Sequence, residues 1–282
     1  MDCFFEKGGN TIDTARLYGC TDFNGESLSE ITVGKWVKAN NMYGKAVIIT
    51  KGGHPDLQNR SISRLDRKSL LSDIDRSLND LNISQIDMYF LHRDDPVASA
   101  AEIMETLAEA VKAGKIKHIG ASNWRFDRIM EANRYAEAHN LPPFEISQIQ
   151  WSVVATVPER YDATLVCMNK EEYAKYNASQ FPVLAYAAQA KGFAVRTING
   201  GIFANNNKAV DRFCTPENIH LLRKIKEMPG SATQISLGAI TNSSIPACAI
   251  LGCKTVEQVE DSMTAADFTM TAEQVESINL FG

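Results

Sequence analysis

The chain has 282 residues, of which 44% are hydrophobic and 22% are charged, and its formal net charge is -5 at pH 7. This composition is typical of a globular protein, and the length fits one barrel domain of roughly 250 residues. The acidic balance gives no reason to expect nucleic acid as a partner, so we expect a small molecule. Apolar runs stay well short of the roughly 18 residues of a membrane span, and the opening MDCFFEKGGN lacks the features of a signal peptide.

The cysteines indicate a reducing compartment. None of them has the CxxC spacing of a zinc site or a redox dithiol, and histidines do not cluster beside them. We therefore expect reduced thiols, no metal and a cytoplasmic location. The six cysteines stand at positions 3, 20, 167, 214, 248 and 253.

Short apolar runs alternate with amphipathic segments along the chain. The runs predict strands, and apolar residues at three- and four-residue spacing predict helices between them. This alternation predicts a parallel sheet with helices outside it. The predicted strands are residues 10–13, 46–50, 86–91, 117–120, 145–149, 182–185 and 247–251. The predicted helices are residues 29–40, 68–81, 101–112, 125–138, 256–264 and 272–278, with long loops at 156–176 and 197–212 and a tight turn at 226–232.

Nearly every predicted strand ends on a polar or aromatic side chain able to take part in chemistry. In a barrel the C-terminal ends of the strands converge on one mouth, where barrel enzymes keep their active sites. An open sheet would show the same alternation, but no GxGxxG follows the first strand, which counts against a dinucleotide-binding sheet. The strand-end residues are Asp13, Lys51, His92, Ser122, Asn123, Gln148 and Tyr186.

Seven strands are one fewer than a closed barrel needs. Residues 3–7 look like the end of a helix stopped by Gly8 and Gly9. The fold class predicted is therefore an α/β protein, a (β/α)8 TIM barrel forming a single domain over residues 1–282, without its N-terminal first strand and most of its first helix. A fragment or mis-started gene product, a partner chain that completes the barrel, and a degenerate protein would each explain this beginning.

Four of the polar residues together suit proton transfer. A phenol such as Tyr18 is a poor acid at neutral pH unless a cation stabilises its phenolate, and Lys51 can supply that cation. Asp13 can hold the ammonium group, and His92 can donate a hydrogen bond to a carbonyl oxygen. Taken singly, they also fit a strand-end cap, a surface tyrosine, a solvated lysine and a structural histidine.

Several segments resemble the aldo-keto reductase superfamily. They are GGNTIDTARLYG (8–19), IITKGGHPD (48–56), IDMYFLHRDDP (86–96), GKIKHIGASNW (114–124) and SQIQW (147–151). The resemblance covers nearly the whole chain and implies NAD(P)H-dependent reduction of carbonyls, with Asp13, Tyr18, Lys51 and His92 as the catalytic group. It further implies that Ser122, Asn123 and Gln148 bind the nicotinamide carboxamide and that Tyr186 stacks on the nicotinamide ring.

The segment LGCKTVEQVEDS (251–262) resembles the part of the family that binds the adenosine end of the cofactor. A helix starting near Thr255 would favour phosphate oxygens, and Lys254 could neutralise a 2′-phosphate, which favours NADPH over NADH. The family often has Arg and Asn where Gln258 and Ser262 stand here. The cofactor residues implied in this segment are Gly252, Lys254, Gln258, Asp261 and Ser262.

We therefore expect an oxidoreductase that reduces an aldehyde, ketone or sugar carbonyl to an alcohol, with Tyr18 as proton donor. Residues beside the site that offer hydrogen-bonding or stacking surfaces to a substrate are His54, Arg93, Trp124 and Trp151. The alternatives are a nicotinamide-binding regulatory module and an inactive truncated remnant.

Overall fold

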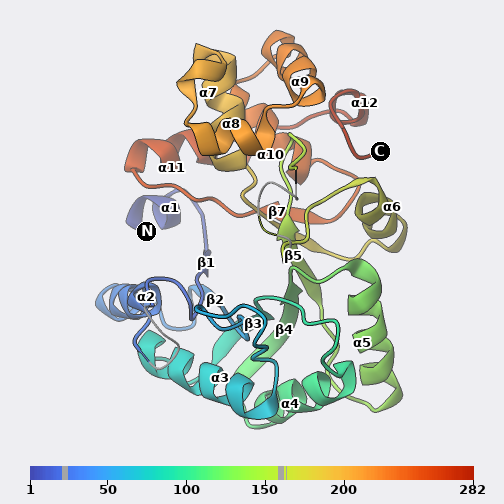
Figure 1. Cartoon of the computed structure of the whole chain (residues 1–282). Coiled ribbons are helices and arrows are strands. Elements are labelled where there is room, and N and C mark those ends of the chain that lie inside the picture. The colour runs from blue at the N-terminus through green and yellow to red at the C-terminus, as the bar shows by residue number, and fades with distance from the viewer. Residues whose placement is uncertain (21–24, 158–161, 163) are drawn as a thin grey trace. The chain divides into compact units, whose positions relative to one another are not determined.

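The computed structural model describes residues 1–20, 25–157, 162 and 164–282 (Figure 1). The chain divides into two compact units. The N-terminal unit is Asn10–Ser147, and the C-terminal unit combines Met1–Gly9 with Gln148–Gly282. Among the described residues, no helix combines the length and the apolar character that crossing a membrane requires.

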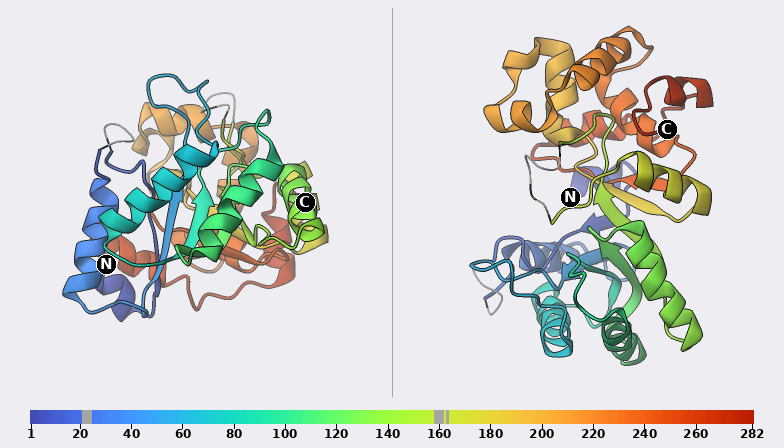
Figure 2. Two further views of the ribbon diagram at one scale, coloured as in Figure 1. Left: turned by 90° about the horizontal axis from the view of Figure 1, so that it is seen from below. Right: turned by 45° about the vertical axis from the view of Figure 1, so that its right-hand side comes forward.

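The N-terminal unit contains parallel strands that pair in chain order, with helices along their outer face. Asp13 pairs with Ile49, and Gly52 pairs with Leu91. Figure 2 (left), seen from below, shows these helices side by side in front of the strands. The strands are β1 (Thr11–Asp13), β2 (Val47–Gly52), β3 (Ile86–Leu91), β4 (Ile116–Ser122) and the first residues of β5 (Ile146–Gln150). The helices are α2 (Leu28–Ala39), α3 (Arg67–Leu81), α4 (Ala100–Lys112) and α5 (Phe126–Ala138).

Side-chain caps fix where three of these helices begin. Ser27, Asp66 and Ser99 each accept a hydrogen bond from the backbone N–H three residues later, which satisfies a donor that the helix itself cannot use. Helices α2 and α3 approach closely at Gly34, where an added Cβ would lie 2.3 Å from the carbonyl oxygen of Leu81. Only glycine therefore allows this contact between the two helices.

The C-terminal unit contains the end of β5, two further strands and most of the helices. The Trp151 N–H donates to the Tyr186 carbonyl at 3.3 Å, and β6 pairs with β7 in parallel. Its core packs Phe193 and Phe213 among aliphatic side chains. The strands are β6 (Val183–Tyr186) and β7 (Ala247–Ala249). The helices are α1 (Asp2–Glu6), α6 (Lys170–Ser179), η2 (Ala190–Gly192), α7 (Phe193–Gly200), η3 (Ile202–Ala204), α8 (Asn207–Phe213), α9 (Pro216–Glu227), α10 (Ala232–Thr241), α11 (Val256–Met263) and α12 (Ala272–Ser277).

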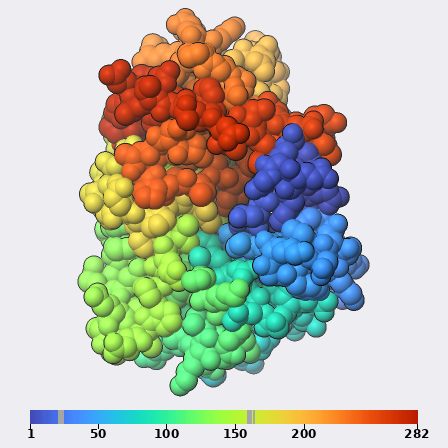
Figure 3. All heavy atoms as spheres, turned by 180° about the vertical axis from the view of Figure 1, so that it is seen from behind, coloured from blue at the N-terminus to red at the C-terminus, as the bar shows by residue number. Residues whose placement is uncertain are grey.

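The start of the chain packs against helix α11 within the C-terminal unit. Helix α1 packs against α11, and Lys7 forms an exposed ion pair with Glu260 at 4.0 Å. Figure 3 shows this contact as the dark blue N-terminal segment beside the orange-red segment.

The structure confirms the seven predicted strands and the six predicted helices, with bounds that shift by up to two residues. The prediction of a loop over residues 197–212 was wrong, because helices α7 and α8 occupy most of it. Asn206, one of the residues that suggested a loop, caps α8 by accepting from the Ala209 N–H at 2.9 Å. The predicted loop at 156–176 overlaps the start of α6, and its residues 158–161 and 163 lie outside the described residues. The absence of a first barrel strand and of most of its helix stays a prediction.

Candidate functional site

Four of the predicted site residues lie at the C-terminal ends of neighbouring strands in the N-terminal unit. Asp13 ends β1, Lys51 is the penultimate residue of β2, His92 directly follows β3 and Ser122 ends β4. Because the strands are parallel, these ends lie at one edge of the sheet. Tyr18 lies in the turn after β1.

Lys51 is the centre of this cluster. Its side chain is 1% exposed, and its Nζ donates to Asp13 Oδ1 at 2.5 Å and to the Thr14 carbonyl at 2.8 Å. The same Nζ lies 5.2 Å from the centre of the Tyr18 ring. An ammonium group buried in this way needs a nearby negative charge, which the Asp13 carboxylate provides. The result is a fixed cation beside a phenol that is 42% exposed.

Three aromatic rings meet edge to face beside the ammonium group. The His92 ring lies 5.8 Å from the Tyr18 ring and 5.1 Å from the His54 ring, centre to centre. Burial, followed by the charge of Lys51, holds the pKa of His92 well below its usual value. His92 is therefore neutral near pH 7, and a neutral imidazole keeps one N–H that can donate to a substrate oxygen.

Ser122 and Asn123 extend the cluster along the same edge. Both are buried, and Asn123 adopts a left-handed backbone conformation with φ of 58°. Its Nδ2 donates to the His92 carbonyl at 3.2 Å and to Ser122 Oγ at 3.1 Å. Asparagine tolerates this conformation better than most residues, so the turn after β4 fixes an amide group beside His92.

A buried ion-pair network centred on Arg16 lies next to this cluster, and the sequence analysis did not identify it. Arg16 is 1% exposed and donates to Glu30 at 3.1 Å, to Asp80 and to the Gly25 carbonyl. Burial alone would lower the pKa of Arg16, but its hydrogen bonds and charge interactions with Glu30 and Asp80 outweigh it and raise that pKa. For the Glu30 carboxyl, burial has the opposite effect and raises the pKa. The one sequence signal was a carboxylate at the position of Glu30, on the apolar stripe of the predicted helix 29–40.

The residues after His92 form a second charged group. Arg93 Nη1 donates to the His92 carbonyl at 2.8 Å. Burial raises the pKa of Asp94 to about 6, and Arg128 lies 3.7 Å from its carboxylate. The Arg128 guanidinium also lies 5.4 Å from the centre of the Trp124 ring.

Of the four predicted substrate residues, the two tryptophans and His54 are buried. Trp124 is fully buried with its ring 5.3 Å from that of Phe144, so it presents no surface to a ligand in this conformation. Trp151, in the C-terminal unit, is 3% exposed and packs edge to face on Tyr173. His54 belongs to the aromatic group described above, and its Nδ1 lies 2.8 Å from the Pro55 carbonyl oxygen.

The remaining predicted cofactor residues belong to the C-terminal unit. Gln148 is buried in β5, and Tyr186 is half-buried at the end of β6. Helix α11 begins next to Thr255, as expected, and Lys254 is exposed just before it. The side chain of Gln258 accepts a hydrogen bond from the Lys254 N–H at 2.7 Å. Gly252 is exposed, Asp261 accepts from Thr233 at 2.5 Å, and Ser262 accepts from Gln189 at 3.3 Å.

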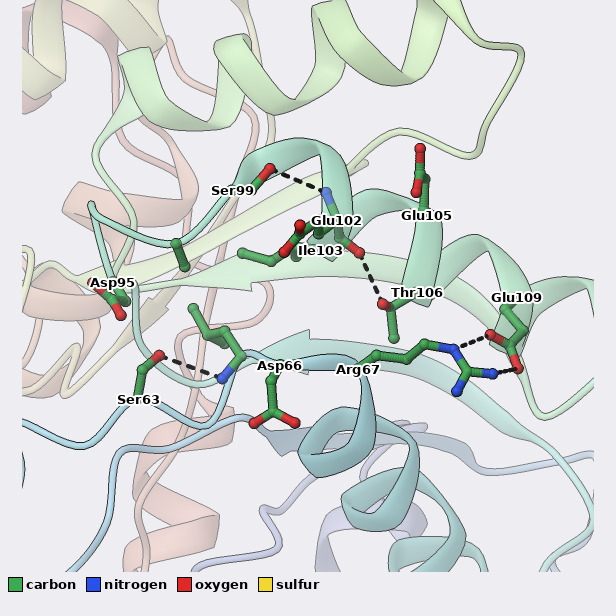
Figure 4. A pocket seen from close by; sticks show the side chains of 12 residues that line it. Ser63, Asp66, Arg67, Asp95, Ser99, Glu102, Ile103, Glu105, Thr106 and Glu109 are labelled. Atoms are coloured by element: carbon green, nitrogen blue, oxygen red, sulfur yellow. Dashed lines mark hydrogen bonds and ion pairs between the residues drawn. The ribbon is translucent and has the colours of Figure 1, made fainter.

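A cavity of about 520 Å³ lies elsewhere in the N-terminal unit, around the start of α3 and along α4 (Figure 4). Five of its twelve lining residues are carboxylates, and its one arginine, Arg67, is held by Glu109 through two hydrogen bonds. None of the predicted site residues lines this cavity. It is therefore separate from the cluster around Lys51, and we assign it no ligand.

Comparison with known proteins settles the family. The model of the aldo/keto reductase family matches residues 1–281. The chain belongs to this family. Among solved structures, the thermostable aldo-keto reductase Tm1743, determined with the inhibitor epalrestat, is similar with a TM-score of 0.70 and 20% identity. The match covers 99% of this chain and 84% of that one, and it shows the same α/β fold with a parallel sheet like that of an aldo-keto reductase barrel.

The similar curated proteins are named as oxidoreductases. The probable aryl-alcohol dehydrogenase AAD4 of Saccharomyces cerevisiae is 27% identical over 98% of this chain and 84% of its own length. The norsolorinic acid reductase stcV of Emericella nidulans is 26% identical over 99% of this chain and 70% of its own length. The aryl-alcohol dehydrogenase [NADP(+)] of Phanerodontia chrysosporium is 24% identical, with corresponding shares of 99% and 74%.

Proposed function

We propose that this family member is an NADPH-dependent carbonyl reductase that converts an aldehyde, ketone or sugar carbonyl to an alcohol. One observation carries the proposal: a buried ammonium group, held by Asp13, lies 5.2 Å from the ring of the exposed Tyr18. A cation in this place stabilises the phenolate that remains after the phenol has given up its proton. Tyr18 is therefore the proposed proton donor.

The nicotinamide, when bound, supplies the hydride that adds to the carbonyl carbon. The electron pair of the C=O π bond moves to the oxygen, which takes the phenolic proton of Tyr18. Lys51 stabilises the phenolate, which regains a proton from solvent, and neutral His92 donates a hydrogen bond that orients the carbonyl oxygen. Asp13 keeps the ammonium group in place throughout.

The chemistry of the residues present fits NADPH. Ser122, Asn123 and Gln148 are buried hydroxyl and amide groups that can serve a carboxamide as both donors and acceptors, and Tyr186 offers a ring to the nicotinamide. At the adenosine end, exposed Lys254 precedes a helix N-terminus, an arrangement that favours a phosphate group. One relative is named for NADP(+), which supports NADPH over NADH. The proposed contacts at that end are Gly252, Lys254, Gln258, Asp261 and Ser262.

The names of the relatives support a small organic substrate, and an aryl aldehyde is the first probe to use. His54 and Arg93 are the proposed substrate contacts nearest to His92, and Trp124 and Trp151 stay predictions in that role. The family match over residues 1–281 supports our proposal that the chain acts as one barrel domain. The lack of CxxC spacing among the six cysteines supports the proposal of a reducing, cytoplasmic compartment.

The substitution Tyr18→Phe tests the proposal. It removes the proton donor while keeping the ring beside His92, so turnover of an aryl aldehyde should fall by about 10²–10⁴-fold. A fluorescence titration should show NADPH binding close to wild type in the same variant. Reduction at the wild-type rate by Tyr18→Phe would refute the mechanism, and NADPH binding without turnover by the wild-type protein would instead favour a regulatory module.

A further inference from the structure

Arg16 lies in the loop that follows β1, two residues before Tyr18. Its side chain is buried. An arginine is almost never fully buried unless its charge is paired. Here Glu30 of α2 and Asp80 of α3 both accept from Nη1, and the Gly25 carbonyl accepts from Nη2. One guanidinium group therefore connects two helices and the segment that precedes α2.

One side of this network holds the backbone of Tyr18. Asp80 accepts from the Ser27 N–H at 2.8 Å as well as from Arg16. The Ser27 hydroxyl in turn donates to the Tyr18 carbonyl at 3.0 Å and to the Ala15 carbonyl at 3.2 Å. The position of Tyr18 thus depends on a carboxylate that the guanidinium group keeps in place.

The other side of the network holds the strand that carries Lys51. The Arg16 N–H donates to the Lys51 carbonyl at 2.9 Å. Glu30, bound to Arg16 through Oε2, accepts through Oε1 from the hydroxyl of Thr50 at 2.6 Å. The residue beside Lys51 is therefore connected to the guanidinium group through one carboxylate.

We propose that Arg16 is a positioning residue of this enzyme, which fixes the Tyr18 loop relative to Lys51 and so sets the distance between phenol and ammonium group. The proposal rests on the proposed function for its catalytic consequence, but the geometric part stands on the network alone. A guanidinium group has a planar fork of donors that can reach several acceptors at once, whereas a lysine ammonium acts as a point charge on a flexible chain. Lysine at this position would keep the positive charge but could not hold Glu30, Asp80 and the Gly25 carbonyl at the same time.

The test compares Arg16→Lys with Arg64→Lys. Arg64 makes a similar partly buried ion pair with Asp73 of α3, whose carboxylate accepts from the Gly53 N–H at 2.9 Å, so this pair holds the end of β2 and not the backbone of Arg16. In Arg16→Lys we expect kcat for the aryl aldehyde to fall by about 10- to 100-fold, because small misplacements of reacting groups cost this much. KM for the aldehyde and the affinity for NADPH should stay within about threefold of wild type, since their proposed contacts are unchanged. Arg64→Lys should keep kcat within about threefold.

Hydrogen exchange of a peptide covering residues 14–20 gives a readout that needs no activity. The Arg16, Thr14 and Tyr18 amides are hydrogen-bonded in this segment, so their exchange should accelerate in Arg16→Lys and not in Arg64→Lys. Unchanged exchange in Arg16→Lys, or an equal loss of kcat in both variants, would overturn the proposal. If Arg16→Lys does not fold, Asp80→Asn, which keeps an oxygen acceptor in place, decides the same comparison. A wild-type protein without reductase activity would refute the proposed function, while the exchange experiment would still decide the role of Arg16.

Discussion

The charge of Lys51 gives the sharpest quantitative prediction, and Lys51→Met removes it while keeping an unbranched side chain. Nζ lies 5.2 Å from the centre of the Tyr18 ring; with that distance as the charge separation and an effective dielectric constant of about 20, a unit charge stabilises a phenolate by about 3 kcal/mol. That energy corresponds to about a hundredfold in rate. The Asp13 carboxylate, 2.5 Å from Nζ, offsets part of it, so we expect kcat to fall by about 10- to 100-fold. The assay is loss of NADPH absorbance with an aryl aldehyde at saturating concentrations.

Loss of stability must be separated from loss of chemistry in this experiment. Lys51→Met leaves the Asp13 carboxylate, which is 13% exposed, without its cation, and breaking such a buried pair costs about 3–5 kcal/mol. The double variant Asp13→Asn/Lys51→Met removes both charges and should recover much of that stability, as measured by urea denaturation. Its kcat should stay as low as that of the single variant. A folded Lys51→Met protein with kcat within about threefold of wild type would refute the proposed role of the ammonium group.

Three further substitutions test other parts of the structure. Burial raises the pKa of Asp94 to about 6, so the folded state holds this proton more tightly than the unfolded state, and stability is lost as pH rises from about 4 to 6. Asp94→Asn should therefore raise the free energy of unfolding, measured by urea titration, by about 1–3 kcal/mol at neutral pH. Near pH 4 the substitution should leave this free energy unchanged. Equal effects at both pH values would contradict burial of the carboxylate as the cause. Gly34→Ala should destabilise the fold by about 1–3 kcal/mol, because its Cβ would lie 2.3 Å from the Leu81 carbonyl oxygen, and an unchanged thermal transition would refute this. Lys254→Ala should weaken NADPH binding by about tenfold and NADH binding hardly at all, and equal losses in fluorescence titrations would argue against a 2′-phosphate contact.

The strands and the residues at their ends could be predicted because they depend on local patterns. Apolar runs bounded by polar residues mark a buried parallel strand, and the chemistry after each run marks its C-terminal end. Asp13, Lys51 and His92 were found in this way, and their proximity follows from parallel pairing. The edge-to-face contact of His54 with His92 could not be predicted, because it depends on how the turn after β2 is bent.

The Arg16 network could not be predicted because its partners are distant in sequence. Asp80 is separated from Arg16 by 64 residues, and only the packing of α2 on α3 brings them together. Trp124 shows the opposite limit: a tryptophan next to a site residue looks available to a substrate, but its ring is buried against Phe144. A residue next to a site residue in the sequence has its backbone near the site, but the sequence does not predict the direction in which its side chain points.

The distribution of the cluster along the chain bears on the order in which the protein is made. Every residue of the proposed proton-transfer group lies between Asp13 and His92, within the compact unit Asn10–Ser147, whereas the proposed adenosine contacts lie at residues 252–262. At roughly 5–20 residues per second, translation of the intervening chain takes on the order of ten seconds, and domains fold from the N-terminus as they emerge. The whole Asn10–Ser147 segment therefore leaves the ribosome before the adenosine segment has been synthesised, so a nascent chain carries its proposed proton donor before it has the residues that hold the cofactor.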